Sequence, residues 1–113
     1  MRAILGNGIA IDAARQGKTN PWPEGTIPAK LHWKQKNSDT FPTAIVPGEF
    51  VHAEFMIEDS EKYAATGGWG IARWLGDRQQ PYVKDAAFVQ ECIGCHTKVR
   101  SQDFVFTAPV KLP

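Results

Sequence analysis

Two thiols and one imidazole lie within five residues near the carboxyl end of the chain, in Cys92-Ile93-Gly94-Cys95-His96. The C-x-x-C-H spacing is typical of covalent c-type haem attachment, because two thiols three positions apart reach the two vinyl groups of one porphyrin. The adjacent imidazole then binds the iron as an axial ligand. The motif therefore predicts one covalent haem c, attached through Cys92 and Cys95, with His96 as the iron ligand.

Other interpretations of these residues are a redox-active thiol pair, half of a zinc site, and coincidence. A tetrahedral zinc site needs four ligands, and the chain offers only two further histidines and scattered carboxylates. A thioredoxin-like pair needs a β-α-β context, whereas this pair falls late on a predicted C-terminal helix. Haem attachment is the interpretation that uses all three side chains of the motif.

Composition limits the class of protein. Hydrophobic residues make up 42% and charged residues 22% of the 113 residues, which is typical of one globular domain. A formal net charge of +1 predicts no broad basic face, so we expect no nucleic-acid partner. No stretch reaches the roughly 18 consecutive apolar residues of a membrane span.

The amino-terminal residues Met1–Asn7 contain too short an apolar run for a secretory signal. Haem c is attached outside the bacterial cytoplasm, so the motif predicts a periplasmic or otherwise exported protein. We therefore expect the sequence to lack a natural amino-terminal segment and signal peptide.

The first predicted element of secondary structure is a helix that Asn7 caps and that ends at Gly17 and Lys18. Its apolar positions fall on one stripe: Ile9, Ala10, Ala13 and Ala14. Strands are then predicted over Thr26–Trp33, Phe50–Glu58 and Trp69–Trp74. In the first two strands the apolar residues alternate with more polar ones.

The remaining segments are predicted as a loop over 34–48, a short helix over 59–63, a turn at 67–68, a loop over 77–82, a helix from about Lys84 to Lys98 and a last strand over 104–107. Pro28 predicts that the first of the three strands is an edge strand or begins irregularly. Together these elements predict an α+β fold: a single domain over 1–113 with a small antiparallel β-sheet, flanking helices and a C-terminal haem-attachment helix.

Three segments resemble the cytochrome P-460 family and its relatives, the beta-sheet cytochromes c′: GTIPAKLHW, FVHAEFMIEDSEKYAATGGWGIARW and ECIGCHTKVRSQDFVFT. The resemblance runs from about Arg2 to Thr107. It implies a largely antiparallel β domain with one haem c, commonly a homodimer, and in its better-known members the oxidation of hydroxylamine.

The resemblance also implies roles for single residues. Lys30 matches a lysine that is covalently bonded to the porphyrin edge, and Glu54 matches a carboxylate on the distal side of the haem. Trp69 matches an aromatic position of the family core. Lys30 and Glu54 both lie on the less apolar faces of their strands, so neighbouring strands could point both into one pocket.

The distal ligand of the iron separates the possible functions. Electron-transfer cytochromes usually carry the motif near the amino end and supply a methionine ligand. Here the motif is near the carboxyl end, and Met56 is expected to pack in the core. His52 is a second candidate ligand, although we expect an ordinary surface or core histidine. An open distal face is therefore predicted.

Two main functions are compatible with an open iron. The leading hypothesis is oxidation of hydroxylamine, or of a related small nitrogen species, with Glu54 as a base whose pKa burial raises towards the working pH. Electrons would pass to a redox partner protein. The alternative is binding of nitric oxide or carbon monoxide without turnover. A simple electron carrier would instead need Met56 or His52 on the iron.

The four tryptophans are expected to pack in the core and the haem pocket: Trp22, Trp33, Trp69 and Trp74.

Overall fold

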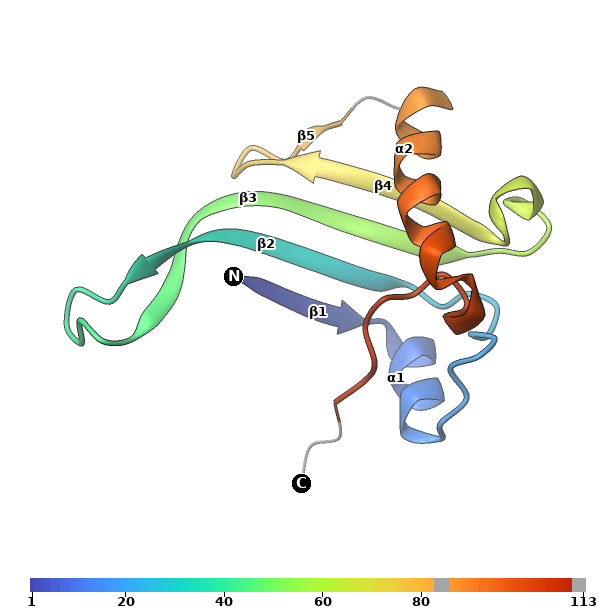
Figure 1. Ribbon diagram of the computed structural model, residues 1–113, viewed down its shortest axis with the longest axis horizontal. Helices are drawn as coiled ribbons and strands as arrows, with labels where there is room; N and C mark the ends of the chain where they lie inside the picture. Colours follow the sequence, from blue (N-terminus) through green and yellow to red (C-terminus); the bar gives the residue numbers. More distant parts are fainter. Residues whose placement is uncertain (83–85, 111–113) are drawn as a thin grey trace.

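A single antiparallel β-sheet forms the centre of the computed structural model, which describes residues 1–82 and 86–110. Five strands follow one another across this sheet in chain order: β1 (Arg2–Gly6), β2 (Pro28–Asn37), β3 (Ile45–Glu58), β4 (Trp69–Leu75) and β5 (Gln80–Pro81). Two α-helices accompany them, α1 (Gly8–Arg15) and α2 (Ala86–His96) (Figure 1). The predicted α+β class is confirmed.

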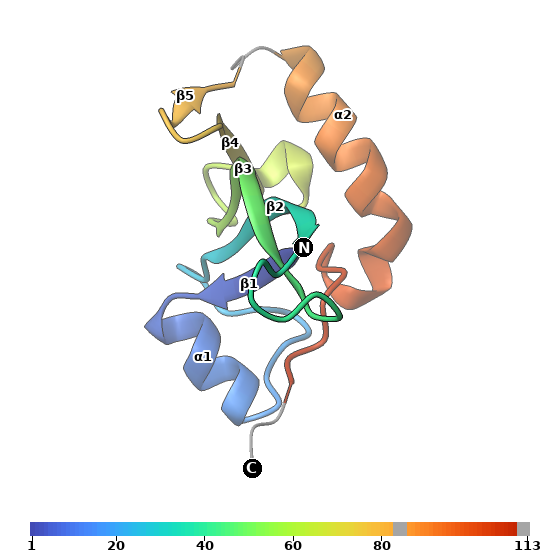
Figure 2. The ribbon, with the colours of Figure 1, turned by 90° about the vertical axis from the view of Figure 1, so that its left-hand side faces the viewer.

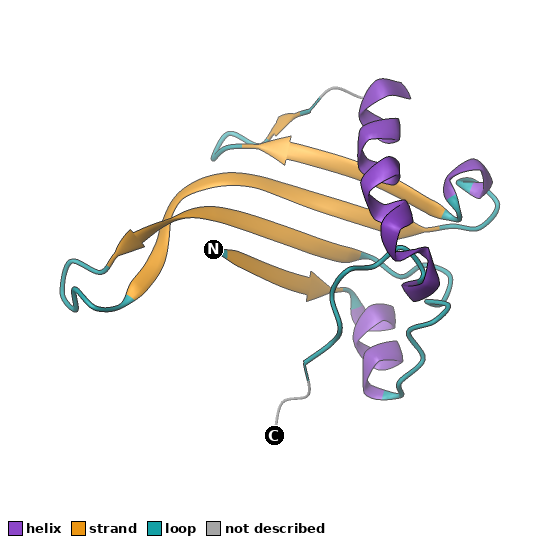
Figure 3. Ribbon diagram, in the orientation of Figure 1, coloured by secondary structure: helices purple, strands orange, loops and turns teal. Residues whose placement is uncertain are grey.

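The two helices take different places around the sheet. Helix α2 crosses the strands along one face, and α1 lies beyond the end of β1, on the other side of the sheet in the side view (Figure 2). The described residues also include two short 3₁₀ helices, η1 (Ala64–Thr66) and η2 (Thr97–Gln102), and η2 directly continues α2 (Figure 3). The motif-bearing helix therefore covers one face of the sheet.

Helix α1 forms as predicted, because Asn7 satisfies the backbone around its start. The Asn7 side-chain oxygen accepts the backbone N–H groups of Ala10 and Ile27, both at 3.1 Å, and its amide donates to the Gly25 carbonyl at 2.8 Å. Ala10 and Ala13 are buried. One side chain thus caps the helix and ties it to the chain entering β2.

Strand β1 was not predicted, and it changes the position of β2 in the sheet. Residues Arg2–Gly6 pair antiparallel with β2, so β2 lies inside the sheet, and the prediction of an edge strand is wrong. Pro28 is the first residue of β2 and lies opposite Gly6. Proline is tolerated at the first residue of a strand, because it has no N–H group to donate to the hydrogen bonds between strands.

Strands β2 and β3 extend further than the alternation predicted. The predicted loop over 34–48 is only residues 38–44 in the structure. Residues 34–37 of β2 and 45–49 of β3 continue the strand pairing up to Asn37 and Ile45, and these residues with the loop form an arm. Register shifts on either side of Trp33 interrupt the alternation of apolar and polar residues, so the sequence pattern did not predict that the strands continue into the arm. The arm projects to the left in Figure 1.

Three shorter predictions need correction. The expected helix over 59–63 is a turn followed by η1, and the expected loop over 77–82 contains β5. Residues 104–107 form no strand, because Asp103 and Phe104 have φ values of +51° and +62°, which interrupt an extended backbone. The predicted helix over Lys84–Lys98 is confirmed as α2 within the described residues, with Lys84 outside them.

The core lies between the sheet and the segment after α2. Trp69 is completely buried against Phe104 and Val105, and Trp22 and Met56 pack around them. The core positions predicted for Trp69 and Met56 are confirmed. Residues predicted as a strand contribute instead an irregular segment that inserts two apolar side chains into the core.

Glu58 is an acid at the edge of this core, and it makes the stability depend on pH. The residue is 8% exposed, and its Oε2 has no hydrogen-bond partner within the described chain. Burial, followed by the charges of Asp103, Glu24 and Asp59, raises the pKa of Glu58 from 4.5 to about 7. Between pH 4.5 and about 7, the folded protein therefore keeps the Glu58 carboxyl group protonated, whereas the unfolded chain releases the proton. The resulting stability is complete below pH 4.5 and is lost as the pH rises through about 7.

We expect the substitution Glu58→Gln to stabilise the protein at alkaline pH, because the amide keeps the shape of the neutral acid and cannot ionise. The gain in unfolding free energy is about 3 kcal/mol at pH 8 and below about 1 kcal/mol at pH 5. Urea unfolding at both pH values measures it, with the exposed Glu61→Gln as the matched control. An equal effect at pH 5 and pH 8 would contradict the buried acid.

Candidate haem site

The motif occupies the last turns of α2. Cys92 is half-buried and Cys95 is exposed, and both thiols are free. At 100° per residue, Cys92, Cys95 and His96 project from one side of the helix, whereas Gly94 projects from the opposite side. Burial raises the pKa of the Cys92 thiol. The motif thus presents two thiols and an imidazole together, as attachment to one porphyrin requires.

His96 is oriented by the segment that follows α2. Its Nδ1 lies 2.6 Å from the carbonyl oxygen of Phe104, and the Phe106 ring lies 5.1 Å away between centroids. A carbonyl only accepts hydrogen bonds, so Nδ1 carries a proton, and Nε2 is the ring nitrogen that remains for a metal ion. Metal-binding histidines are commonly held in this way. The residues present therefore fit a haem whose iron binds Nε2 of His96.

A row of three charged side chains crosses the face of the sheet that α2 covers. Glu54 of β3 lies directly opposite Lys30 of β2 and directly opposite Arg73 of β4. Lys30 Nζ forms an ion pair with Glu54 Oε2. Arg73 places Nε at 2.6 Å and a terminal nitrogen at 2.5 Å from Glu54 Oε1. The structure therefore brings the predicted Lys30 and Glu54 together.

The charged row faces the motif across the space between sheet and helix. The charges of Arg73, Glu54 and Lys30 all act on the Cys92 thiol. Residues from three strands and from α2 thus form one electrostatic environment. The thiols and His96 come from the helix, and the charged groups come from the sheet.

The expected direction of the pKa shift at Glu54 is wrong. Burial raises the pKa of Glu54, but the hydrogen bond and charge of Lys30, followed by those of Arg73, outweigh burial and leave the pKa below its ordinary 4.5. The sequence prediction considered only the apolar neighbours along β3. In the folded chain Glu54 is an ionised carboxylate at neutral pH.

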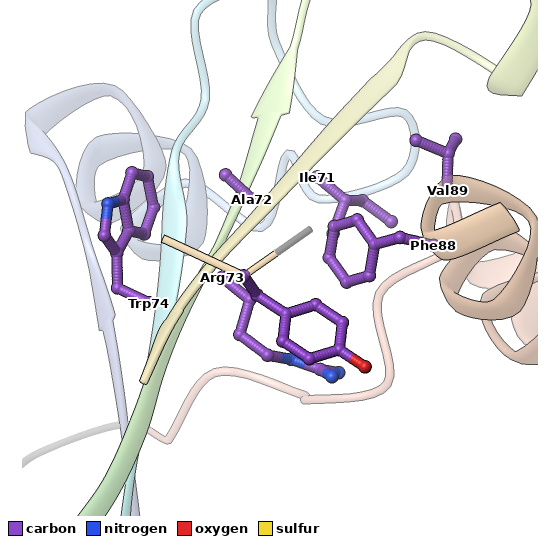
Figure 4. A pocket seen from close by; sticks show the side chains of 7 residues that line it. Ile71, Ala72, Arg73, Trp74, Phe88 and Val89 are labelled. Carbon is purple, nitrogen blue, oxygen red and sulfur yellow. The ribbon is translucent and has the colours of Figure 1, made fainter. Parts of the chain in front are cut away.

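Arg73 was missed by the sequence prediction. Its guanidinium lies 5.1 Å from the centre of the Tyr82 ring and 5.4 Å from that of the Phe88 ring. Arg73 and Phe88 both line a cavity of about 200 Å³, and Figure 4 shows them projecting towards it from β4 and α2. The cavity is lined by Ile71, Ala72, Arg73, Trp74, Tyr82, Phe88 and Val89. The alternation of apolar and polar residues along β4 gave no reason to expect that Arg73 differs from an arginine that faces solvent.

His52 lies beside the charged row. Its Nε2 is buried, is 3.7 Å from Glu54 Oε2 and has no hydrogen-bond partner among the described residues. Its ring contacts that of His32 edge to face, with centroids 4.9 Å apart. Burial lowers the pKa of His52, and the opposing charge of Glu54 does not outweigh it. A neutral imidazole therefore adjoins an ionised carboxylate.

Within residues 1–82 and 86–110, no group of three or more His, Cys, Asp or Glu side chains is arranged to hold a metal ion. The zinc interpretation of Cys92 and Cys95 therefore finds no further ligands in the part of the chain that is described. In the same part, none of the helices is long and apolar enough to cross a membrane.

An oriented histidine therefore follows two free thiols on a helix that covers an antiparallel sheet, and these residues fit a haem. The model of the family described as Cytochrome P460 matches residues 1–107. The chain belongs to the cytochrome P460 family and is accordingly a haem-binding cytochrome. A comparison with curated proteins found no match.

Proposed function

We propose that the protein carries one haem c, bonded to Cys92 and Cys95, and oxidises hydroxylamine or a related small nitrogen species. Bound haem supplies an iron that takes electrons from the substrate and passes them to an external acceptor. His96 would hold the iron through Nε2, while its Nδ1–H donates to the Phe104 carbonyl. Attachment through two thioethers fits the free thiols on one side of α2.

The observation that carries the proposed oxidation is the placement of Glu54, which forms ion pairs with Lys30 and Arg73 on the face of the sheet under α2. Oxidation of hydroxylamine releases protons along with electrons, and an ionised carboxylate accepts them. Glu54 Oε2 accepts a substrate proton in this scheme, and the neighbouring His52 lies 3.7 Å away. Capture of nitric oxide or carbon monoxide needs no proton acceptor, so this polar row favours turnover.

Simple electron transfer receives less support, because it needs a sixth iron ligand. Met56 packs against the core cluster around Trp69. His52 keeps a buried Nε2 that lies beside Glu54. We propose further that the protein works in the periplasm as a homodimer with a redox partner protein, as the family resemblance implies.

The proposed activity is tested by steady-state oxidation of hydroxylamine by the haem-loaded protein with an artificial electron acceptor. Turnover above that of free haem supports the proposal. Tight binding of nitric oxide or carbon monoxide without hydroxylamine turnover would replace it with the gas-binding alternative.

Lys30 is proposed to bond through Nζ to the porphyrin edge, where it replaces a ring hydrogen; the C–H and N–H bonds that break release two protons and two electrons, which pass to an external oxidant. The bonded nitrogen then no longer carries the charge that pairs with Glu54. We expect a strongly red-shifted, broadened Soret band in the ferrous protein and a tryptic Lys30 peptide joined to the haem peptide. Lys30→Arg removes both, because a guanidinium is not nucleophilic at neutral pH. The exposed Lys34→Arg is the matched control. An ordinary c-type spectrum and no adduct in the wild-type protein would exclude the bond.

A further inference from the structure

We propose that Arg73 is a positioning residue that holds Oε1 of Glu54, so that Oε2 is the oxygen that accepts the substrate proton. This inference rests on the proposed role of Glu54 as a base. It adds a residue from β4 that neither the motif nor the family resemblance indicated.

The two oxygens of Glu54 have separate partners. Oε1 receives both contacts from Arg73, at 2.6 Å from Nε and 2.5 Å from the terminal nitrogen. Oε2 is shared by the Lys30 amine and His52, whose Nε2 lies 3.7 Å away. If Lys30 bonds to the porphyrin, Oε2 loses its charged partner while Oε1 keeps Arg73. Arg73 is then the contact that keeps the carboxylate in place.

The guanidinium group of Arg73 is itself held in position by aromatic rings. Its guanidinium lies over the Tyr82 ring and near the Phe88 ring, which contact each other at 5.2 Å between centroids. Phe88 is 5% exposed and belongs to α2, the helix that carries the haem motif (Figure 4). A planar guanidinium stacks on aromatic rings and binds a carboxylate through two nitrogens, which an ammonium group cannot do. Arg73 thus links the position of Glu54 to that of α2.

The charged and titratable groups around Glu54 come from every neighbouring element. Strand β2 supplies Lys30 and His32, β3 supplies His52, β4 supplies Arg73, and α2 supplies Cys92. Lys30 and Arg73 lower the pKa of Glu54 against the effect of burial. Loss of Arg73 therefore raises this pKa.

The test compares Arg73→Met and Arg73→Lys in the haem-loaded protein. The first readout is the ¹³C NMR titration of the Glu54 carboxyl carbon in the ferrous, carbon monoxide-bound form, assigned with Glu54→Gln. We expect the midpoint to move to higher pH in Arg73→Met, with a smaller change in Arg73→Lys, which keeps the charge. The exposed Arg78→Met is the matched control and leaves the midpoint unchanged.

The second readout is hydroxylamine turnover. Both substitutions at Arg73 are expected to lower kcat about 10- to 100-fold with little change in KM, because each loses the two-point hold on Oε1. The acid limb of the pH–rate profile moves to higher pH in Arg73→Met, and by less in Arg73→Lys. If Arg73→Met fails to take up haem, Arg73→Gln serves for the same comparison.

An unchanged NMR midpoint in Arg73→Met, or a wild-type kcat in Arg73→Lys, would overturn the role of Arg73. Absence of hydroxylamine turnover in the wild-type protein would instead overturn the proposed function. In that case the NMR midpoint, which needs no substrate, still decides whether Arg73 governs the carboxylate.

Discussion

In the Lys30→Arg background, where no bond from residue 30 to the porphyrin edge can form, a Cys92→Ser, Cys95→Ser double variant is expected to contain no covalently bound haem. A serine hydroxyl does not form the thioether that joins each cysteine to a vinyl group, so the whole attachment is lost. Denaturing gel electrophoresis with haem staining, after expression with a cytochrome c maturation system, measures the result. The Lys30→Arg band stains, and the band of the double variant made in that background does not.

The matched control for this experiment is Gly94→Ala within the same motif. A Cβ added at Gly94 meets no atom within 4 Å, and the position projects away from the thiols. Alanine also favours the helix over glycine by about 1 kcal/mol. We expect full haem staining in this variant. Staining of the double serine variant at wild-type intensity would exclude attachment through these thiols.

The Glu54→Gln variant is expected to keep its haem and to lose hydroxylamine turnover by about 10²- to 10⁴-fold, the usual contribution of a general base. Glutamine has nearly the same shape but accepts no proton at neutral pH. Steady-state kcat together with the haem-staining intensity separates lost chemistry from lost cofactor. The exposed Glu49→Gln is the control, since its carboxylate pairs with Lys34 at the surface, away from the charged row.

The pH dependence of wild-type turnover follows from the lowered pKa of Glu54. A carboxylate whose pKa lies below 4.5 stays ionised from neutral pH down to that value, so the rate due to this group falls only at more acidic pH. If Lys30 is bonded to the porphyrin, its charge is lost and the acid limb moves to higher pH. Unchanged turnover in Glu54→Gln would remove the residue from the mechanism.

The features that could be predicted from the sequence depend on residues close together in the chain. The motif lies within five residues, and the capped helix α1 depends on Asn7 and the alanines that follow it. Alternation over a few residues also identified the central parts of β2, β3 and β4. Lys30 and Glu54 could be assigned to strand faces for the same reason, and their ion pair follows from the register of β2 and β3.

The features that could not be predicted depend on contacts between distant segments. Strand β1 is defined by its pairing with β2, and Phe104 leaves an extended path because its backbone turns to reach Trp69 in the core. An isolated segment shows neither contact, so local propensity misassigned both.

The same distinction applies at the site. The sequence by itself determined which groups are present: two thiols, an imidazole, an amine and a carboxylate. Only the tertiary structure decided that Arg73 shares Glu54 with Lys30, and that Phe104 supplies the carbonyl that orients His96. A pKa and a tautomer depend on charges and hydrogen bonds within a few ångströms, and folding brings those groups from different strands and loops.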